Sequence, residues 1–173
     1  MIKFENTMMH GRFQPFHNGH LEYLNYSLNL TINHIVIGIT NPLNNTSKVE
    51  ETDRHRHLKS SNPLSFWDRY KIIDSIMERF SVKYTIIPFD IHDTKSFLQL
   101  VPAFFTQIVM ETEAWDTQKI KIFKDCGYNV FSAKLDRITS GTIVRNNIRK
   151  NLEWENLVPK ETYDYIINNN IKI

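Results

Sequence analysis

The stretch Gly11-Arg12-Phe13-Gln14-Pro15-Phe16-His17-Asn18-Gly19-His20 is the part of the chain around which the fold is predicted. A short apolar run at 7–10 precedes it, and leucines recur at helical spacing from Leu21 to Leu28. An apolar run followed by helical periodicity predicts a strand, a turn and a helix. The ten residues would then form the turn and the start of the helix, and functional residues are concentrated in loops on rigid scaffolds.

The residue types of this turn are suited to binding an anion. Gly11 permits backbone conformations that are closed to other residues, or the close approach of a ligand. A helix N-terminus offers free amides and a positive dipole, and Gly19 leaves room there for a ligand. His17 and His20 would share one helix face. With Arg12 nearby, these side chains predict a phosphate site.

Two histidines at this spacing also occur as half of a metal site. A zinc site needs further Cys, His or carboxylate ligands. Cys126 is the only cysteine, and no His-x-x-x-His helix follows the turn. We therefore predict no metal-binding side chains in this chain.

A second candidate anion site lies near the other end of the chain, in Ser140-Gly141-Thr142-Ile143-Val144-Arg145. Ser140 is a good helix N-cap residue. The amides of Gly141 and Thr142 would be free at the start of that helix, and Arg145 falls three residues beyond Thr142. The pattern again favours an anion at a helix N-terminus, although a capped helix with a surface arginine would have the same sequence.

Both stretches resemble motifs of one superfamily. The first resembles the signature of the nucleotidyltransferases that carry the H-x-G-H motif, relatives of class I aminoacyl-tRNA synthetases. Its longer form, G-R-F-Q-P-F-H-x-G-H, is similar to that of archaeal-type nicotinamide-nucleotide adenylyltransferases. The second resembles S-G-T-x-[IV]-R, which in that family grips the outer phosphates of ATP. The resemblance covers most of the chain and is weakest at 42–61 and 93–118.

Bulk properties are those of an ordinary globular protein. The chain has 173 residues, with 41% hydrophobic and 23% charged residues, which predicts one domain spanning 1–173. The formal charge of +2 gives no support for a nucleic-acid partner or an anionic membrane surface. One cysteine fits a reducing compartment. No apolar run approaches the roughly 18 residues that span a bilayer, so we expect a cytoplasmic protein without a membrane partner.

Short apolar runs alternate with helical patterns along the chain. Further strands are predicted at 34–40, 84–89, 106–110 and 128–133, and helices at 18–30, 65–80, 95–100, 119–126 and 161–167. This alternation predicts an α/β fold: a single Rossmann-like domain with an open parallel sheet of about five strands and helices on both faces.

The segment 41–62 lacks apolar periodicity and is rich in polar and basic residues, which predicts a long mobile loop. It follows a predicted strand, at the edge of the sheet where ligands bind in open α/β folds. It is either a solvated insertion or a lid whose basic residues approach the triphosphate. The resembling family has a shorter loop here.

The resemblance places the acceptor of the reaction beside Asp90 and Ile91, where the family carries Asp-Ile. Phe97 takes the place of a tryptophan that stacks on the nicotinamide ring in that family, and it offers less area. Arg69 matches the arginine of the family's Gly-Glu-Arg, or else it is a surface arginine after a helix cap. Trp115 lies in a segment that departs from the family pattern, so it either supplies an aromatic face or packs inside.

The resemblance implies direct in-line transfer of AMP from ATP to nicotinamide mononucleotide (NMN), giving NAD and pyrophosphate. It implies Mg²⁺ bound with ATP, and a homo-oligomer. The implied catalytic residues are His17, His20, Arg12 and Arg145. The implied ATP-binding residues are Gly11, Arg12, Phe13, Gln14, His17, Gly19, His20, Ser140, Gly141, Thr142 and Arg145. The implied acceptor-binding residues are Asp90, Ile91, Phe97, Trp115 and Arg69.

Three alternatives stay open at this point. A cytidylyltransferase using CTP, a phosphopantetheine adenylyltransferase, or a nucleotide sensor without turnover would each keep the two phosphate motifs. The usual G-x-F-D or G-T-F-D opening of the first two relatives differs from the Arg12-Phe13-Gln14 form here.

Overall fold

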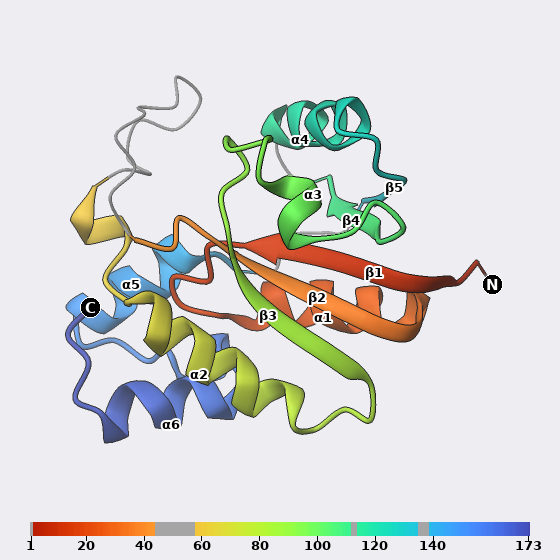
Figure 1. Ribbon diagram of the computed structural model, residues 1–173. Helices are drawn as coiled ribbons and strands as arrows, with labels where there is room; N and C mark the ends of the chain where they lie inside the picture. The colour runs from red at the N-terminus through yellow and green to blue at the C-terminus, as the bar shows by residue number, and fades with distance from the viewer. Residues whose placement is uncertain (1, 44–57, 112–113, 135–138) are drawn as a thin grey trace.

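The computed structural model describes residues 2–43, 58–111, 114–134 and 139–173 (Figure 1). Strands and helices alternate along the chain, as predicted. The strands are β1 (Phe4–Gly11), β2 (Thr31–Thr40), β3 (Lys83–Phe89), β4 (Thr106–Met110) and β5 (Val130–Ala133). The α-helices are α1 (Asn18–Leu30), α2 (Phe66–Met77), α3 (Phe97–Leu100), α4 (Ala114–Asp125), α5 (Gly141–Arg149) and α6 (Lys160–Asn168), and the short 3₁₀ helices are η1 (Lys59–Ser61) and η2 (Glu155–Leu157).

The strands form one open parallel sheet in the order β3-β2-β1-β4-β5. The chain moves outward from β1 through β2 to β3, then returns to β4 on the other side of β1. In open α/β sheets, ligands bind outside the carboxyl ends of the strands at the point where this order reverses. That point lies between β1 and β4, so the sheet directs a ligand to the end of β1, where the ten-residue turn begins.

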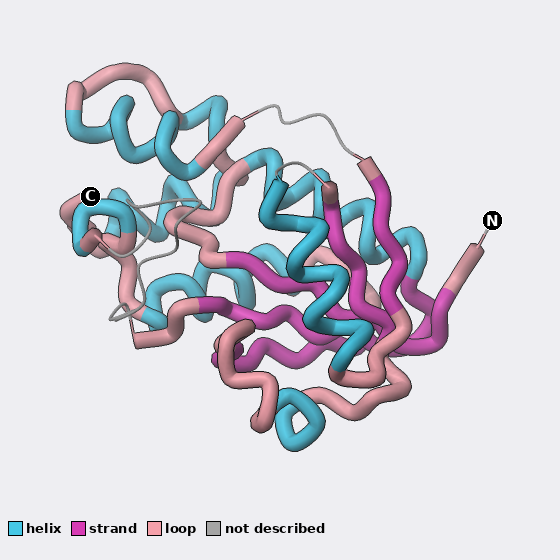
Figure 2. The backbone as a smooth tube through the Cα atoms, turned by 90° about the horizontal axis from the view of Figure 1, so that it is seen from above, coloured by secondary structure: helices cyan, strands magenta, loops and turns pink. Residues whose placement is uncertain are grey.

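Helices cover both faces of the sheet, as Figures 1 and 2 show. Met9 of β1 packs in a core cluster with residues of α1 and α2, among them Leu24 and Ile73. Met8 packs on the opposite face with Phe97 of α3 and Phe123 of α4, among others. The alternation of side chains along a strand explains why neighbouring methionines face different helices. The prediction of an α/β fold with helices on both faces of a five-stranded parallel sheet is confirmed.

Several element boundaries differ from the prediction. Strand β2 begins at Thr31, directly after α1, where we expected a strand only from residue 34. The Thr31 hydroxyl donates a hydrogen bond to the Ser27 carbonyl at 2.7 Å. It forms a second hydrogen bond with Thr7 Oγ1, also at 2.7 Å. These bonds join the helix end to the sheet without a loop. Strand β5 begins at Val130 instead of residue 128, because Tyr128 is buried and donates to the Val101 carbonyl at 2.6 Å.

Two helix ends are fixed by local bonds and backbone angles. Ser65 caps α2: its Oγ accepts from the Asp68 N–H at 3.1 Å, and Asp68 accepts from the Ser65 N–H at 2.9 Å. Gly127 has φ of 86° just after α4, the left-handed conformation that glycine adopts readily at a helix end. Among the residues that the structure describes, no helix is both long and apolar enough to cross a membrane. The predicted mobile loop at 41–62 falls mainly on 44–57, outside the described residues.

Candidate active site

The first turn of α1 brings the two predicted histidines together. His17 is the N-cap residue, and its main-chain N–H donates to Nδ1 of His20 at 3.3 Å. The two imidazole rings are stacked, with centroids 3.7 Å apart. Because Nδ1 of neutral His20 accepts this bond, its proton is placed on Nε2, which leaves an N–H donor at the far edge of the ring. The rings thus form one polar surface beside the free amides of the helix.

The turn before the helix is held by its own side chains. Phe13, not Gly11, has the left-handed conformation, with φ of 52°. This corrects the expectation that Gly11 supplies the unusual backbone angles. Positive φ is uncommon for a bulky residue and persists where the surroundings enforce it. Phe13 is buried and stacks on Phe16 at 5.3 Å, and the edge of its ring contacts His20 at 4.9 Å. These contacts fix the direction in which the His20 ring points.

Gln14 connects the turn to two distant segments. Its side-chain amide donates to the Leu64 carbonyl at 2.9 Å and accepts from the Leu64 N–H at 2.9 Å. Its main-chain carbonyl accepts a bond of 2.6 Å from Nη1 of Arg145. The side chain of Gln14 therefore anchors the turn, and only its backbone remains available to line a nucleotide pocket.

The second motif begins α5 as predicted, with Ser140 Oγ accepting from the Ile143 N–H at 3.3 Å. It lies against the first motif. A β-carbon on Gly141 would fall 2.8 Å from the Gln14 carbonyl oxygen, and one on Gly19 would fall 3.4 Å from the Thr139 carbonyl oxygen. At Gly141 only a residue without a side chain lets the backbones approach so closely, whereas the Gly19 distance is an ordinary contact. The N-termini of α1 and α5 therefore meet, and both present amides to the same space.

Arg145 connects the two motifs. It is buried, and Nη2 also donates to Thr142 Oγ1 at 3.2 Å. The alternative of a surface arginine after a helix cap is therefore excluded. The guanidinium bridges the carbonyl end of the first turn and the hydroxyl of the second motif, so a triphosphate bound between the helix N-termini would lie beside a cation that is already fixed in place.

The environment of Arg69 differs from the environment expected for either of its predicted roles. Only 1% of its surface is exposed, and the guanidinium donates to main-chain carbonyls around it. The accepting carbonyls belong to Ser65, Arg12, Thr40, Asn41 and Pro42. Burial and then the charge of Arg12 lower the pKa of Arg69 to about 10, so it stays charged at neutral pH.

With its donors directed at these carbonyls, Arg69 is placed to hold the loops after β1 and β2 together. It is not a surface residue, and this position gives no support to a direct contact with the acceptor. That role stays a prediction. In the sequence, Arg69 is recognisable only as an arginine in the first turn of a predicted helix that comes after a strand. That position does not indicate that the side chain is buried.

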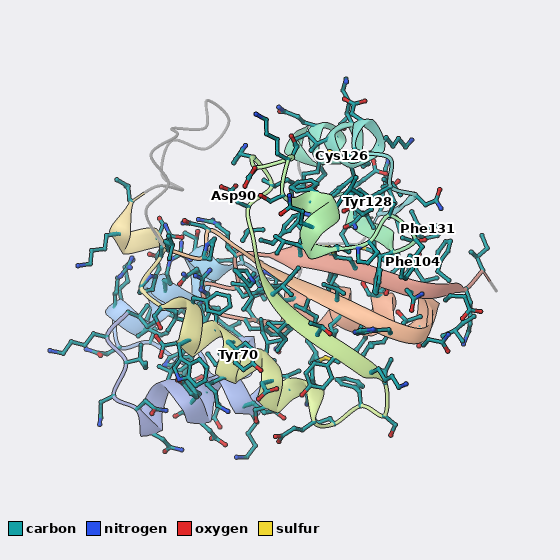
Figure 3. The ribbon with its side chains drawn as sticks, viewed as in Figure 1. Tyr70, Asp90, Phe104, Cys126, Tyr128 and Phe131 are labelled. Atoms are coloured by element: carbon teal, nitrogen blue, oxygen red, sulfur yellow. The ribbon has the colours of Figure 1, made fainter. Side chains whose placement is uncertain are left out.

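The predicted acceptor residues differ in their exposure to solvent. Asp90 is exposed on the loop between β3 and α3, where its Oδ1 accepts from the His92 N–H at 2.9 Å (Figure 3). Ile91 is buried. Phe97 is 1% exposed and packs against Phe89 at 4.7 Å and Phe123 at 5.6 Å.

A ring so enclosed is a core residue, and its position gives no support to stacking on a nicotinamide ring, which stays a prediction. Trp115 belongs to α4, and its side chain lies outside the described part of the structure.

The described side chains do not cluster as metal ligands do. Within residues 2–43, 58–111, 114–134 and 139–173, no group of three or more His, Cys, Asp or Glu side chains is placed to hold a metal ion. The side chains that the structure describes therefore do not form a protein cage for a cation.

A parallel sheet with two helix N-termini meeting at its switch point is the architecture of a nucleotidyltransferase. The model of the family described as Cytidylyltransferase-like matches residues 8–162, so the chain belongs to the cytidylyltransferase-like family. The expected membership of the nucleotidyltransferase superfamily is confirmed.

Two relatives cover most of the chain. A phosphonoformate cytidylyltransferase from Streptomyces viridochromogenes is 34% identical over 157 residues, which are 88% of this chain and 85% of that protein. A nicotinamide-nucleotide adenylyltransferase from Methanococcus aeolicus is 30% identical over 161 residues, 90% of this chain and 84% of that protein. Their names state different nucleotides and different acceptors, so together they support nucleotidyl transfer as the class of reaction.

One solved structure shows the same fold. A bifunctional NMN adenylyltransferase/ADP ribose pyrophosphatase from Francisella tularensis, complexed with AMP and a manganese ion, has a TM-score of 0.62 and 16% sequence identity. The match covers 96% of this chain but only 53% of that protein. At this identity the likeness concerns the fold alone.

Proposed function

We propose that this protein transfers AMP from ATP to nicotinamide mononucleotide, giving NAD and pyrophosphate. The observation that carries the proposal is the meeting of the N-termini of α1 and α5, bridged by Arg145 and Gln14. Two sets of free amides, a fixed cation and two stacked imidazoles fit a triphosphate better than a smaller anion. The archaeal relatives named nicotinamide-nucleotide adenylyltransferases support the choice of acceptor.

The chemistry requires positioning more than bond activation. An oxygen of the acceptor phosphate attacks the α-phosphorus of ATP, and the bond from that phosphorus to the oxygen bridging to the β-phosphate breaks. The bonding electrons leave with pyrophosphate. The attacking phosphate is already ionised, so no general base is needed. Catalysis then comes from holding both anions in line and stabilising the charge that builds on the α-phosphoryl oxygens.

The proposed role of each residue follows from its position at the two helix N-termini. His17 and His20 would contact the α-phosphate and the transition state, with the Nε2–H of His20 as a donor. Ser140, Thr142 and Arg145 would hold the outer phosphates. Mg²⁺ would enter with ATP and bind mainly to phosphate oxygens, since Mg²⁺ usually keeps few protein ligands.

A second candidate is cytidylyl transfer from CTP to a small phosphonate or phosphate. The specific observation in its favour is Phe97. This ring takes the place of the family's stacking tryptophan, yet it is enclosed by Phe89 and Phe123, so no aromatic face is offered there to a nicotinamide ring. The relative from Streptomyces viridochromogenes carries such an activity in its name.

One assay separates these functions. The protein is incubated with Mg²⁺, with ATP or CTP, and with NMN, phosphonoformate or phosphopantetheine, while pyrophosphate release is followed and products are identified by mass spectrometry. NAD formed from ATP and NMN supports the proposal. Turnover only with CTP and phosphonoformate supports the second candidate. Binding of a nucleotide without turnover in any combination contradicts both and indicates a nucleotide sensor.

A further inference from the structure

His10 is a buried polar residue beside the phosphate turn. It is the residue before Gly11 at the end of β1, and only 8% of its surface is exposed. Its ring lies among aromatic side chains, 5.1 Å from Phe123 of α4 and 5.9 Å from Phe89 of β3. It pairs with Gly38 of β2, where a β-carbon would come within 3.2 Å of the His10 Cβ. The same β-carbon would lie 2.7 Å from Cε of Met8 and 3.1 Å from Cβ of Phe89, so glycine at position 38 lets these side chains and His10 pack closely over β2.

This imidazole lacks the partner that a buried polar group usually has. Nδ1 is inaccessible to solvent and has no hydrogen bond among the described residues. Such groups are uncommon in folded proteins, and each one calls for a reason, such as a ligand or a water that the site receives. Burial, and then the charge of Lys119, lower the pKa of His10 to about 3. At neutral pH it is a neutral group with one N–H donor and one acceptor nitrogen.

A second polar feature faces His10 from the other side of the switch point. In the first turns of α4, Nζ of Lys119 lies 2.8 Å from Oδ1 of Asp116, and Asp116 is 3% exposed. Both charges act on His10, with opposite signs. An ion pair removed from water is costly, yet this one stands where β4 ends and α4 begins. His10 is thus influenced by an ion pair in an otherwise aromatic region, and of the two charges that of Lys119 has the larger effect.

The location separates this cluster from the triphosphate site. Side chains alternate along β1, so His10 shares the α3 and α4 face with Met8, whereas Met9 faces α1 and its histidines. The loop after β3 and the start of α4 border the same face. A neutral imidazole offers one N–H donor and one acceptor nitrogen but no charge, so it fits a carbonyl or carboxylate oxygen better than a phosphate dianion.

We propose that His10 is a specificity-determining residue of the acceptor site, where its neutral imidazole hydrogen-bonds a carbonyl or carboxylate oxygen of the acceptor. This rests on the proposed function, since it assumes nucleotidyl transfer to an acceptor at the switch point. The oxygen comes from the carboxamide if the acceptor is NMN, or from the carboxylate if it is phosphonoformate.

The test uses variants that separate packing from hydrogen bonding. His10→Phe keeps a ring between Phe89 and Phe123 but removes both nitrogens, and His10→Gln keeps a hydrogen-bonding group. We expect His10→Phe to raise the KM for the acceptor about tenfold, to leave the KM for the nucleotide unchanged, and to leave the melting temperature unchanged or higher. His10→Gln should recover part of the affinity for the acceptor.

Gln107→Leu is the matched control. Gln107 of β4 is fully buried, and both of its side-chain polar atoms lack hydrogen-bond partners among the described residues. It pairs with Met8, two residues further from the edge of the sheet than His10. If removal of any buried unpaired group changed acceptor binding, both variants would show it. We expect only the His10 variants to do so.

Acceptor analogues distinguish the source of the oxygen. Wild-type protein should discriminate against NMN without its carboxamide, or against methylphosphonate in place of phosphonoformate, and His10→Phe should lose that discrimination. Equal KM values for the acceptor in wild type and His10→Phe would overturn the inference and assign the imidazole to an ordered water only. If the wild-type protein shows no turnover with any combination of nucleotide and acceptor, the proposed function is contradicted instead. In that case calorimetry of acceptor binding to wild type and to His10→Phe tests the role of His10 separately.

Discussion

Nη1 of Arg145 donates a hydrogen bond of 2.6 Å to the main-chain carbonyl of Gln14, 131 residues earlier in the chain. This bond ties the start of α5 to the turn before α1, and it makes the two halves of the phosphate site one rigid unit. The structural role of Arg145 is therefore linked to its proposed catalytic role, and a substitution there should affect both.

Arg145→Lys should lower kcat by about ten- to a hundredfold and raise the KM for ATP, because lysine keeps the charge but cannot make the two directed bonds to Gln14 and Thr142. Steady-state kinetics at saturating acceptor measure this. Arg149→Lys, one turn further along α5 and exposed, is the matched control and should retain activity. Equal kinetics for the two variants would contradict the placement of Arg145 in the site.

His20→Ala should lower kcat by roughly two to four powers of ten, a loss of about 3–5 kcal/mol of transition-state stabilisation. The reason is the Nε2–H donor that the His17 hydrogen bond orients towards the phosphate region. Pyrophosphate release under single-turnover conditions gives the rate of the chemical step. Asn25→Ala, at an exposed position of the same helix, should behave as wild type. A folded His20→Ala protein with a normal single-turnover rate would remove His20 from the mechanism.

Gly141→Ala should disturb the site through packing alone. The added β-carbon would lie 2.8 Å from the Gln14 carbonyl oxygen and 2.9 Å from Nη1 of Arg145. Relieving this overlap separates the two helix N-termini and costs about 1–3 kcal/mol of stability. ATP affinity by calorimetry and urea denaturation measure the two effects. Asn146→Ala, exposed on the same helix, is the control, and unaltered ATP affinity in Gly141→Ala would argue against a shared phosphate site.

Arg69→Met should reduce the free energy of unfolding by about 3–5 kcal/mol, because it leaves several buried carbonyls without a donor. Urea denaturation gives this value. Lys71→Met, on the same helix, breaks a partly exposed ion pair with Asp74 of 3.5 Å and a contact of the ammonium with the Trp67 ring at 5.9 Å, and should cost less than about 1 kcal/mol. Should Arg69→Met remain as stable as wild type while acceptor binding disappears, the predicted acceptor role would be favoured over the loop-holding role.

The pKa of His10 predicts a pH effect on stability. Its pKa is lowered to about 3 in the folded protein from 6.5, so between these values the unfolded chain binds a proton that the folded chain does not. The contribution of His10 to stability is therefore present above pH 6.5 and is lost as pH falls towards 3, by about 1.4 kcal/mol per pH unit at most. Asp116 and Lys119 face the imidazole, so the comparison is made with His10→Phe, which keeps both. Urea melts of the two proteins at several pH values should diverge as the pH falls, and parallel curves would contradict the burial of His10.

The order of elements was predictable because it depends on local chemistry. Apolar runs with β-branched residues, such as 35–39, form strands in any context that buries both faces. Ser65, Ser140 and Gly127 mark helix ends through bonds or angles that involve only near neighbours. The placement of both predicted phosphate motifs at helix starts was predictable for the same reason, and phosphate binding there stays a prediction that rests on the anion affinity of helix N-termini.

The roles of individual buried residues were not predictable in this way. Phe97 and Arg69 were expected near a ligand, but the packing of α3 on α4 encloses the first, and carbonyls from three separate segments surround the second. The aromatic neighbours of Phe97 and the carbonyls around Arg69 come from segments that are separate in sequence. No local sequence pattern therefore predicts these contacts.

The sequence by itself determined the class of fold and the capped helix N-termini on which the predicted phosphate site depends, because propensity and capping act over a few neighbouring residues. Only the tertiary structure decided that Arg145 bridges the two motifs, that Phe13 takes the left-handed turn position, and that His10 is buried without a hydrogen-bond partner for Nδ1. Those properties depend on which distant segments the sheet order brings together, and a parallel sheet assembles its active edge from strands that are far apart along the chain.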